Sequence, residues 1–540
     1  MKNKSLFKTL IIVIILTSLI STVAFGYQVQ SGDMVWKIAE KFNVTIEDIV
    51  NANNLEDKNL IFPGQNLIIP SSQQAQEVEE VVEVEKIGQT DKPKYVFYMI
   101  GDGLGASQRQ LAEFYLEEIE GSSKKLLMNT FPAAGINTTY SADTLVTDSA
   151  AAGTALAAGI KTNNGVISQT PEGENVRTLV ECAEDAGMAT GLVSTTRITH
   201  ATPATFASHN VNRNDENGIA VDFVDSGVDF FAGGGIRHFI PQSYTEPEDA
   251  AGNSVKSKRK DDIDVVGMFS DLGYETFISK NGAAEFNTYV PEAGDQVLAL
   301  FTYTHMPYEV DRVAKDLEAP SLSEMTEKAI DLLSKDEDGF FLMVEAGRID
   351  HACHANDAKG AIMDTLAFDE AIEEAYEFYM SHPEETLIVV VGDHETGGMG
   401  LGFANNYFLN MDELEDVDVS VEDTLQYADY DTLEEYLAYI DEHLGLDDLT
   451  AEEIAEIESA MSVETGANPN TYGSYYTPEA IAATHLLSER VNIQWTTFAH
   501  SATAIPMSAV GKGAQDFSGY KDNTEIAQAM AELMNFNLSR

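Results

Sequence analysis

Residues 95–103, YVFYMIGDG, decide the fold class of this chain. Six apolar residues, rich in aromatic and β-branched types, end abruptly at Gly-Asp-Gly. A short run that is apolar at every position is typical of a strand buried on both faces of a parallel sheet. In open α/β sheets ligands bind at the carboxyl ends of the strands. Asp102 therefore marks a candidate site.

Three further runs share this character: ATGLVST (189–195), FFLMVEA (340–346) and TLIVVVG (386–392). Helical patterns separate them, and alternating strands and helices favour a parallel sheet covered by helices. We predict an α/β fold for residues 95–540, with a central, largely parallel sheet sandwiched by helices.

Each of these runs is followed by residue types that bind metals. EAGRIDHACH, GDHETGG and STTRITHATP lie at the three strand ends, and the Asp350–His354 spacing puts both side chains on one helix face. Taken singly, each acid could be an N-cap or a solvated charge, and a lone histidine a satisfied core residue. Together, carboxylates crowded at one sheet edge repel unless cations join them. The candidate site residues, as metal ligands or beside the metal and substrate, are Asp102, His200, Thr202, Glu345, Asp350, His351, His354, Asp393 and His394.

The stretch TDSAAAGTALAAGIKT (147–162) places Ser149 before a run of alanine and glycine. It predicts either a buried helix with a polar N-cap or a serine nucleophile at a helix N-terminus. Small residues allow close packing under a site, and the positive end of the helix dipole favours an anion.

The chain from Tyr95 onward resembles the bacterial alkaline phosphatases. The motifs that carry the resemblance are IGDG, TDSAAAGTALAAGIKT, THATPATFASHNVNR, VEAGRIDHACH, VVGDHETGG and FAHSA, in the family's order. The resemblance implies a phosphomonoesterase in which Ser149 is the nucleophile, through a phosphoserine intermediate, and Arg213 binds phosphate. Two zinc ions and one magnesium ion are implied. Their ligands would be Asp350, His354 and His500 for one zinc; Asp102, Asp393 and His394 for the second; and Asp102, Thr202 and Glu345 for magnesium.

Two positions define a branch of that family. Members carry Asp or His at position 200 and Lys or His at position 351, and this chain has histidine at both. His200 supports metal-bound waters less well than a carboxylate, so a second zinc-like ion at the magnesium position is an alternative. His351 is expected to reach phosphate through water or to face the metals.

The N-terminal region is organised separately. Residues 1–26 combine a basic start, an apolar run and small residues before Tyr27, as in an export signal, with an uncleaved anchor as the alternative. Residues 27–70 resemble a LysM module, which binds N-acetylglucosamine glycans such as peptidoglycan; the alternative is a generic α+β domain. Residues 71–94 form an acidic linker. The matching LysM positions are Tyr27, Val29, Gly32, Asp33, Ile38, Ala39, Asn51, Asn54, Gly64 and 67–70.

Charge restricts the partners. With 89 acidic and 32 basic residues the net charge is −57, which opposes binding to nucleic acid and anionic membranes.

Residues 411–460 lack Lys and Arg, and we expect an acidic helical surface insertion at about 405–485. The two cysteines, Cys182 and Cys353, do not make a disulfide scaffold. The export signal implies a secreted or cell-wall location, and the family resemblance a homodimer.

Two rival functions remain. The LysM part could be the function, with the large domain a degenerate scaffold, but every implied ligand position is filled. The large domain could instead be a phosphodiesterase or sulfatase. The hydroxyl nucleophile and Arg213 favour phosphate monoesters.

Overall fold

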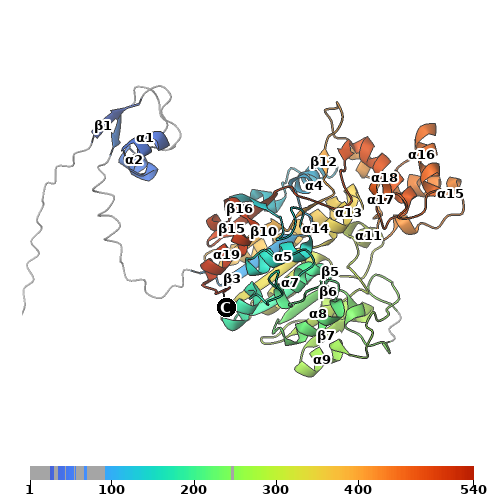
Figure 1. The fold of residues 1–540 in the computed structure, drawn as a ribbon, viewed down its shortest axis with the longest axis horizontal. Helices are drawn as coiled ribbons and strands as arrows, with labels where there is room; N and C mark the ends of the chain where they lie inside the picture. The colour runs from blue at the N-terminus through green and yellow to red at the C-terminus, as the bar shows by residue number, and fades with distance from the viewer. Residues whose placement is uncertain are drawn as a thin grey trace, which may run out of the picture. The chain divides into compact units, whose positions relative to one another are not determined.

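The computed structural model describes residues 25–29, 35–42, 44–53, 55, 66–69, 92–244 and 248–539. The chain divides into two compact units, residues 1–91 and 92–540 (Figure 1). Most of the expected export signal and most of the linker lie outside the described residues. Within the described part, none of the helices is both long and apolar enough to cross a membrane.

The first unit contains strands β1 (Phe25–Gln28) and β2 (Asn66–Ile69), which pair antiparallel, and helices α1 (Val35–Phe42) and α2 (Ile46–Asn53). Among its described residues, seven apolar side chains form a core, including Ile38, Ile49 and Leu67. The Asn53 side chain bonds to both the backbone N–H and the carbonyl of Ile68, which joins α2 to β2. Gly32, Asp33, Asn54, Gly64 and Pro70 of the LysM pattern lie outside the described residues.

The second unit is built on a ten-stranded sheet in the order β16-β4-β15-β10-β3-β9-β5-β6-β8-β7. The four predicted runs are its adjacent central strands: β10 (Thr386–Gly392), β3 (Tyr95–Gly101), β9 (Phe340–Ala346) and β5 (Ala189–Arg197). All three pairings among them are parallel. The predicted fold class is confirmed.

One strand runs against the rest. β15 (Ile505–Gly511) pairs antiparallel with both β10 and β4, whereas the other pairs in this sheet are parallel. The flanking strands are β4 (Ala133–Thr138), β16 (Gly519–Asp522), β6 (Phe230–Gly234), β8 (Val297–Leu300) and β7 (Glu275–Ile278).

Helices cover both faces of the sheet. Both faces of β3 are therefore buried, which explains why its sequence is apolar at every position. Tyr95, Phe97 and Met99 belong to one hydrophobic cluster, and Val96, Tyr98 and Ile100 belong to the other. Helices α4 (Ala106–Glu118), α12 (Leu322–Leu333) and α14 (Ala358–Ser381) pack in the first cluster; α5 (Ser149–Ala158), α7 (Ala201–Ala207) and α19 (Asn523–Met534) pack in the second. Further helices are α6 (Leu179–Asp185), α8 (Glu216–Asp222), α9 (Val265–Leu272), α10 (Ser279–Thr288), α11 (Glu309–Ala314) and α13 (Arg348–His354).

The acidic segment contains α15 (Leu433–Leu444), α16 (Ala451–Met461), α17 (Pro469–Tyr472) and the start of α18 (Pro478–Val491), grouped at one end of this unit (Figure 1). Residues 411–427 form two short 3-10 turns instead of the expected helix. The segment is also more than a surface feature, because Tyr436, Ile440 and Ile457 are buried in the first hydrophobic cluster.

Candidate metal and phosphate site

The parallel register brings the acidic residues to one edge of the sheet. Gly101 at the end of β3 lies opposite Ala346 of β9 and Gly392 of β10. Asp102 and Asp393 follow these ends directly, and Glu345 is the penultimate residue of β9. All three side chains are fully buried.

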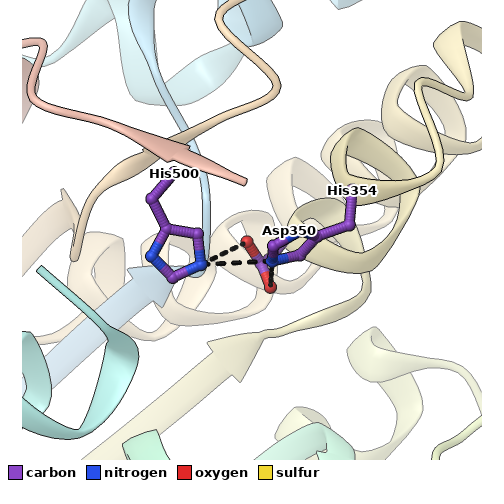
Figure 2. Close-up of side chains that lie close together, drawn as sticks. All are labelled: Asp350, His354 and His500. Atoms are coloured by element: carbon purple, nitrogen blue, oxygen red, sulfur yellow. Dashed lines mark hydrogen bonds and ion pairs between the residues drawn. The ribbon is translucent and has the colours of Figure 1, made fainter. Parts of the chain in front are cut away.

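The first group consists of Asp350, His354 and His500 (Figure 2). Nε2 of His354 lies 3.3 Å from Asp350 Oδ2, and Nε2 of His500 lies 3.6 Å from Asp350 Oδ1. Each imidazole bonds through Nδ1 to a backbone carbonyl, His354 to Phe498 at 2.7 Å and His500 to Thr147 at 2.8 Å. A proton held on Nδ1 in this way leaves Nε2 as a metal ligand.

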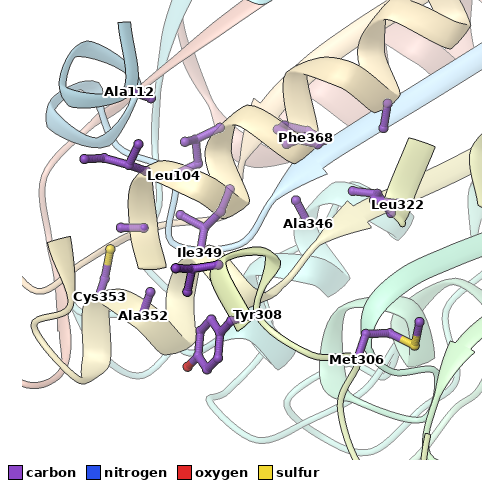
Figure 3. Close-up of a cluster of buried hydrophobic side chains, with 14 of the residues drawn as sticks. Leu104, Ala112, Met306, Tyr308, Leu322, Ala346, Ile349, Ala352, Cys353 and Phe368 are labelled. Atoms are coloured by element: carbon purple, nitrogen blue, oxygen red, sulfur yellow. The ribbon is translucent and has the colours of Figure 1, made fainter. Parts of the chain in front are cut away.

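Helix α13 presents Asp350 and His354 because its other side is anchored in the core. Ile349, Ala352 and Cys353 are completely buried in the apolar cluster that contains Leu104 and Tyr308 (Figure 3). Both cysteines of the chain are buried and free.

The second group consists of Asp102, Asp393 and His394. Nε2 of His394 lies 3.1 Å from Asp393 Oδ2 and 3.4 Å from Asp102 Oδ1. Oγ of Ser149 lies 3.3 Å from the same nitrogen. A hydroxyl therefore reaches the centre of a ligand group that is closed to solvent.

A third group joins Asp102 and Glu345 to His200. The family pattern predicts Thr202 as the third ligand here. Its Oγ1 is buried with no hydrogen-bond partner among the described residues, while the histidine offers a nitrogen within 4.8 Å of both carboxylates. The structure thus adds an imidazole to an otherwise all-oxygen set.

The protein itself leaves these carboxylates unsatisfied. Within the described residues, both oxygens of Asp102, Oε1 of Glu345 and Oδ2 of Asp393 are buried without a hydrogen bond. Burial raises the pKa of Asp102 well above its ordinary range, and the negative charge of Asp393 adds to the shift. Buried polar atoms without partners are costly, so the donor set fits bound divalent cations.

Ser149 begins α5, and the helix is shaped around it. Its N-cap, Asp148, accepts a hydrogen bond from the Ala151 N–H. Every residue of the helix is buried. A Cβ on Gly153 would lie 2.9 Å from Thr205 Oγ1 of α7, so the small residues allow α5 and α7 to pack closely.

Arg213 completes the site. Its Nη1 lies 3.0 Å from Asp148 Oδ2, and its Nη2 lies 3.1 Å from Nε2 of His200. The guanidinium is therefore held beside Ser149, where its fork can bind two oxygens of an oxyanion.

Comparison with known proteins identifies this arrangement. The alkaline phosphatase family model matches residues 93–536. Alkaline phosphatase 3 of Bacillus subtilis (strain 168) is 34% identical over 475 residues, which cover 85% of this chain and 93% of that protein.

The chain belongs to the alkaline phosphatase family.

Solved alkaline phosphatases share the fold of its large domain. The enzyme of Thermus thermophilus superposes with a TM-score of 0.69 at 29% identity, covering 83% of this chain and 92% of that one. The cold-active enzyme of a Shewanella species gives a TM-score of 0.68 at 29% identity, with 82% and 99% covered. A LysM domain model matches residues 27–70, so both predicted family memberships are confirmed.

Sequence reasoning missed a charged cluster in the alkaline phosphatase domain. Arg348 is buried against the Tyr308 ring at 3.6 Å and bonds to the acidic segment through Glu422 and Asp423. Its Nη1 also lies 2.9 Å from Nδ1 of His351. No sequence signal distinguishes Glu422 from its many acidic neighbours.

Sequence reasoning also missed His305, whose imidazole ring lies beside those of His200 and His351. The ring of His305 lies 4.3 Å from that of His351 and 5.5 Å from that of His200. His305 follows β8, so the strand-end rule that found the other ligands could have found it. Both of its ring nitrogens contact Arg197, which makes it a packing partner of the site.

Proposed function

We propose that this protein is a secreted phosphatase that hydrolyses phosphate monoesters through a phosphoserine on Ser149. The observation that carries the proposal is the position of Ser149 Oγ, at the start of a buried helix and 3.3 Å from Nε2 of His394. The helix N-terminus adds positive potential where the phosphate would bind.

The residues of the chain take the following parts. Arg213 holds two non-bridging oxygens, and Asp148 and His200 keep the guanidinium in place. Ser149 Oγ attacks phosphorus, and the ester bond to the alcohol breaks on the side of Asp350, His354 and His500. Water then displaces the serine and releases phosphate. Two inversions give net retention at phosphorus.

The expected cations are two zinc ions and one magnesium ion. Carboxylate–imidazole sets suit zinc, and the Asp102, Glu345 and Thr202 oxygens suit magnesium. When bound, these ions lower the pKa of the serine hydroxyl and neutralise phosphate charge. Because His200 can offer a nitrogen to this group, a zinc ion at the third position is the alternative to magnesium. Anomalous scattering at the zinc edge separates the two: two strong peaks support two zinc ions and one magnesium ion, a third peak supports the alternative, and no peak contradicts both.

The reaction class is tested with three aryl esters that share one leaving group. We expect kcat/KM for the phosphate monoester to exceed that for the diester and the sulfate ester, because Arg213 and the cations complement a dianion. A preference for the diester or the sulfate would overturn the assignment.

We further propose export and attachment to cell-wall glycan through residues 27–70, with residues 71–94 as a spacer. The LysM family implies the glycan class, and the sequence of residues 1–26 supports export. Co-sedimentation with peptidoglycan should retain the full chain and release a variant that lacks residues 27–94, while both hydrolyse the monoester. Equal sedimentation would contradict the tether. Light scattering would test the homodimer that the family suggests.

A further inference from the structure

A cavity of about 650 Å³ opens beside the Asp350–His354–His500 group. Its lining includes His351 and His354 on the side of the metal ligands and Tyr475, Tyr476 and Phe498 farther out. Our proposed mechanism breaks the ester bond on this side, so the cavity lies where the departing alcohol would be.

Three aromatic side chains line the cavity, and two of them, Tyr476 and Phe498, pack against Gly473. The backbone carbonyl of Phe498 accepts the Nδ1–H of His354 at 2.7 Å, so the Phe498 backbone is held directly by a candidate metal ligand. Gly473 lies between two rings: a Cβ there would meet Tyr476 at 2.8 Å and Phe498 at 3.3 Å. Tyr476 is buried, whereas Tyr475 is 84% exposed at the rim.

The charge of the cavity is one-sided. Among the described residues, the lining of the cavity includes the carboxylate of Glu422 but no lysine or arginine. Glu422 is oriented by Arg348 and by the Tyr308 hydroxyl, whose O–H donates to Oε2 at 2.6 Å. An anionic substituent on the alcohol would meet a carboxylate that is already paired with Arg348 and would find no lysine or arginine in the lining to bind it. An aromatic ring would find rings to pack on.

We propose that this cavity selects monoesters of alcohols that carry an uncharged ring, and that Tyr475 is a specificity-determining residue. The proposal rests on the phosphatase function proposed above. The acidic segment supplies both Tyr475 and Glu422, so it would set which alcohol the enzyme accepts.

Ethyl, benzyl and 4-carboxybenzyl phosphate test the proposal, because their alcohols have similar acidity. We expect kcat/KM to be highest for benzyl phosphate, and Tyr475→Ala to lower the benzyl-to-ethyl ratio about two- to tenfold, the range of one aromatic contact. Tyr520→Ala is the matched control: Tyr520 is 72% exposed on β16 and does not line the cavity. Titration calorimetry with benzylphosphonate and ethylphosphonate should show the same fall in the benzyl-to-ethyl ratio of binding affinities for Tyr475→Ala.

The outcomes separate the two proposals. If none of the three esters is hydrolysed, the proposed function fails. If they are hydrolysed but the benzyl-to-ethyl ratio is the same in Tyr475→Ala and wild type, or 4-carboxybenzyl phosphate is the best substrate, the cavity proposal is overturned and the phosphatase function stands.

Discussion

The carboxylate of Asp148 and the guanidinium of Arg213 form an ion pair with 3.0 Å between Oδ2 and Nη1. The same carboxylate accepts hydrogen bonds from the backbone N–H groups of Ala151 and Gly165. It therefore ties Arg213 to the first turn of the helix that begins at Ser149. Together with His200, which contacts the other end of the guanidinium, this carboxylate sets the spacing between Arg213 and Ser149, the proposed phosphate-binding residue and nucleophile.

We predict that Asp148→Ala raises KM for a phosphate monoester about tenfold, because a hydrogen bond to a charged group contributes about 1.5–3 kcal/mol. The change also removes an N-cap, which costs about 1 kcal/mol of stability. Asp264→Ala is the matched control, since Asp264 caps α9 through the Gly267 N–H. Steady-state kinetics should show the KM effect in the first variant alone. An equal KM in both would contradict the positioning role.

Ser149→Ala should lower turnover of an aryl phosphate roughly thousandfold or more, as removal of a nucleophile does in other enzymes. Metal content should stay unchanged, because each of the three groups keeps all of its carboxylate and imidazole ligands. Ser459→Ala, at an exposed position in α16, controls for the loss of a hydroxyl. Near wild-type turnover in Ser149→Ala would rule out the phosphoserine route.

Removal of the metals should expose the mutual repulsion of Asp102 and Asp393. A chelator is expected to abolish activity and lower Tm at alkaline pH. Asp393→Asn removes one buried charge, so the stripped variant should be about 1–3 kcal/mol more stable than the stripped wild type. With zinc present the order should reverse. Calorimetry with and without chelator measures the stability difference between Asp393→Asn and wild type in both states. Asp271→Asn, at an exposed position on α9, controls for the change in net charge. Full activity in chelator would contradict the metal-dependent mechanism.

The centre of the fold and most of the site follow from the sequence for one physical reason. Strands buried on both faces are apolar at every position, so β3, β5, β9 and β10 are visible as uninterrupted runs. Their polar successors, such as Asp102 and Asp393, then stand out as candidate ligands at the sheet edge. Strands farther from the centre of the sheet, such as β4 (AAGINT) next to the edge strand β16, are only partly buried and lack that signature.

The Arg348 cluster could not be predicted in the same way. Its partner Glu422 lies 74 residues away, in a segment where acidic residues are too common for any one to be informative. The contribution of His200 to the third ligand group depends on side-chain geometry, which no spacing in the sequence specifies.

Arg348→Ala should lower the free energy of unfolding by about 3–5 kcal/mol, because it leaves Glu422 and Asp423 without their buried partner. Turnover should fall as well, since Arg348 begins the helix that carries Asp350 and His354. Lys280→Ala is the control for loss of a surface ion pair. Lys280 Nζ lies 3.2 Å from Glu318 Oε2, the two side chains are 47% and 58% exposed, and a surface pair of this kind contributes at most about 1 kcal/mol. Equal urea midpoints for the two variants would contradict the role of Arg348.

Glu184 gives the fold a pH dependence that is separate from the site. Burial raises its pKa from 4.5 to about 7. The negative charge of Asp229 also raises this pKa, whereas the hydrogen bond donated by Thr190 Oγ1 lowers it. Between pH 4.5 and about 7 the Glu184 carboxyl is therefore protonated in the folded state and ionised in the unfolded state. At 1.36 kcal/mol per pH unit this difference corresponds to about 3 kcal/mol, which solvent screening of the partly exposed side chain reduces to about 2 kcal/mol. The free energy of unfolding should therefore be highest below pH 4.5, fall by about 2 kcal/mol as the pH rises to about 7, and then level off.

Glu184→Gln keeps the acceptor for Thr190 and removes the titration. This variant should match wild type at acid pH and be about 2 kcal/mol more stable above pH 7. Urea unfolding across this pH range measures the difference, and Glu172→Gln, at an exposed loop position, supplies the control. Other buried carboxyls titrate in both proteins, so only the gap between the two curves reports on Glu184. Parallel curves would show that the carboxyl ionises in the folded state without cost.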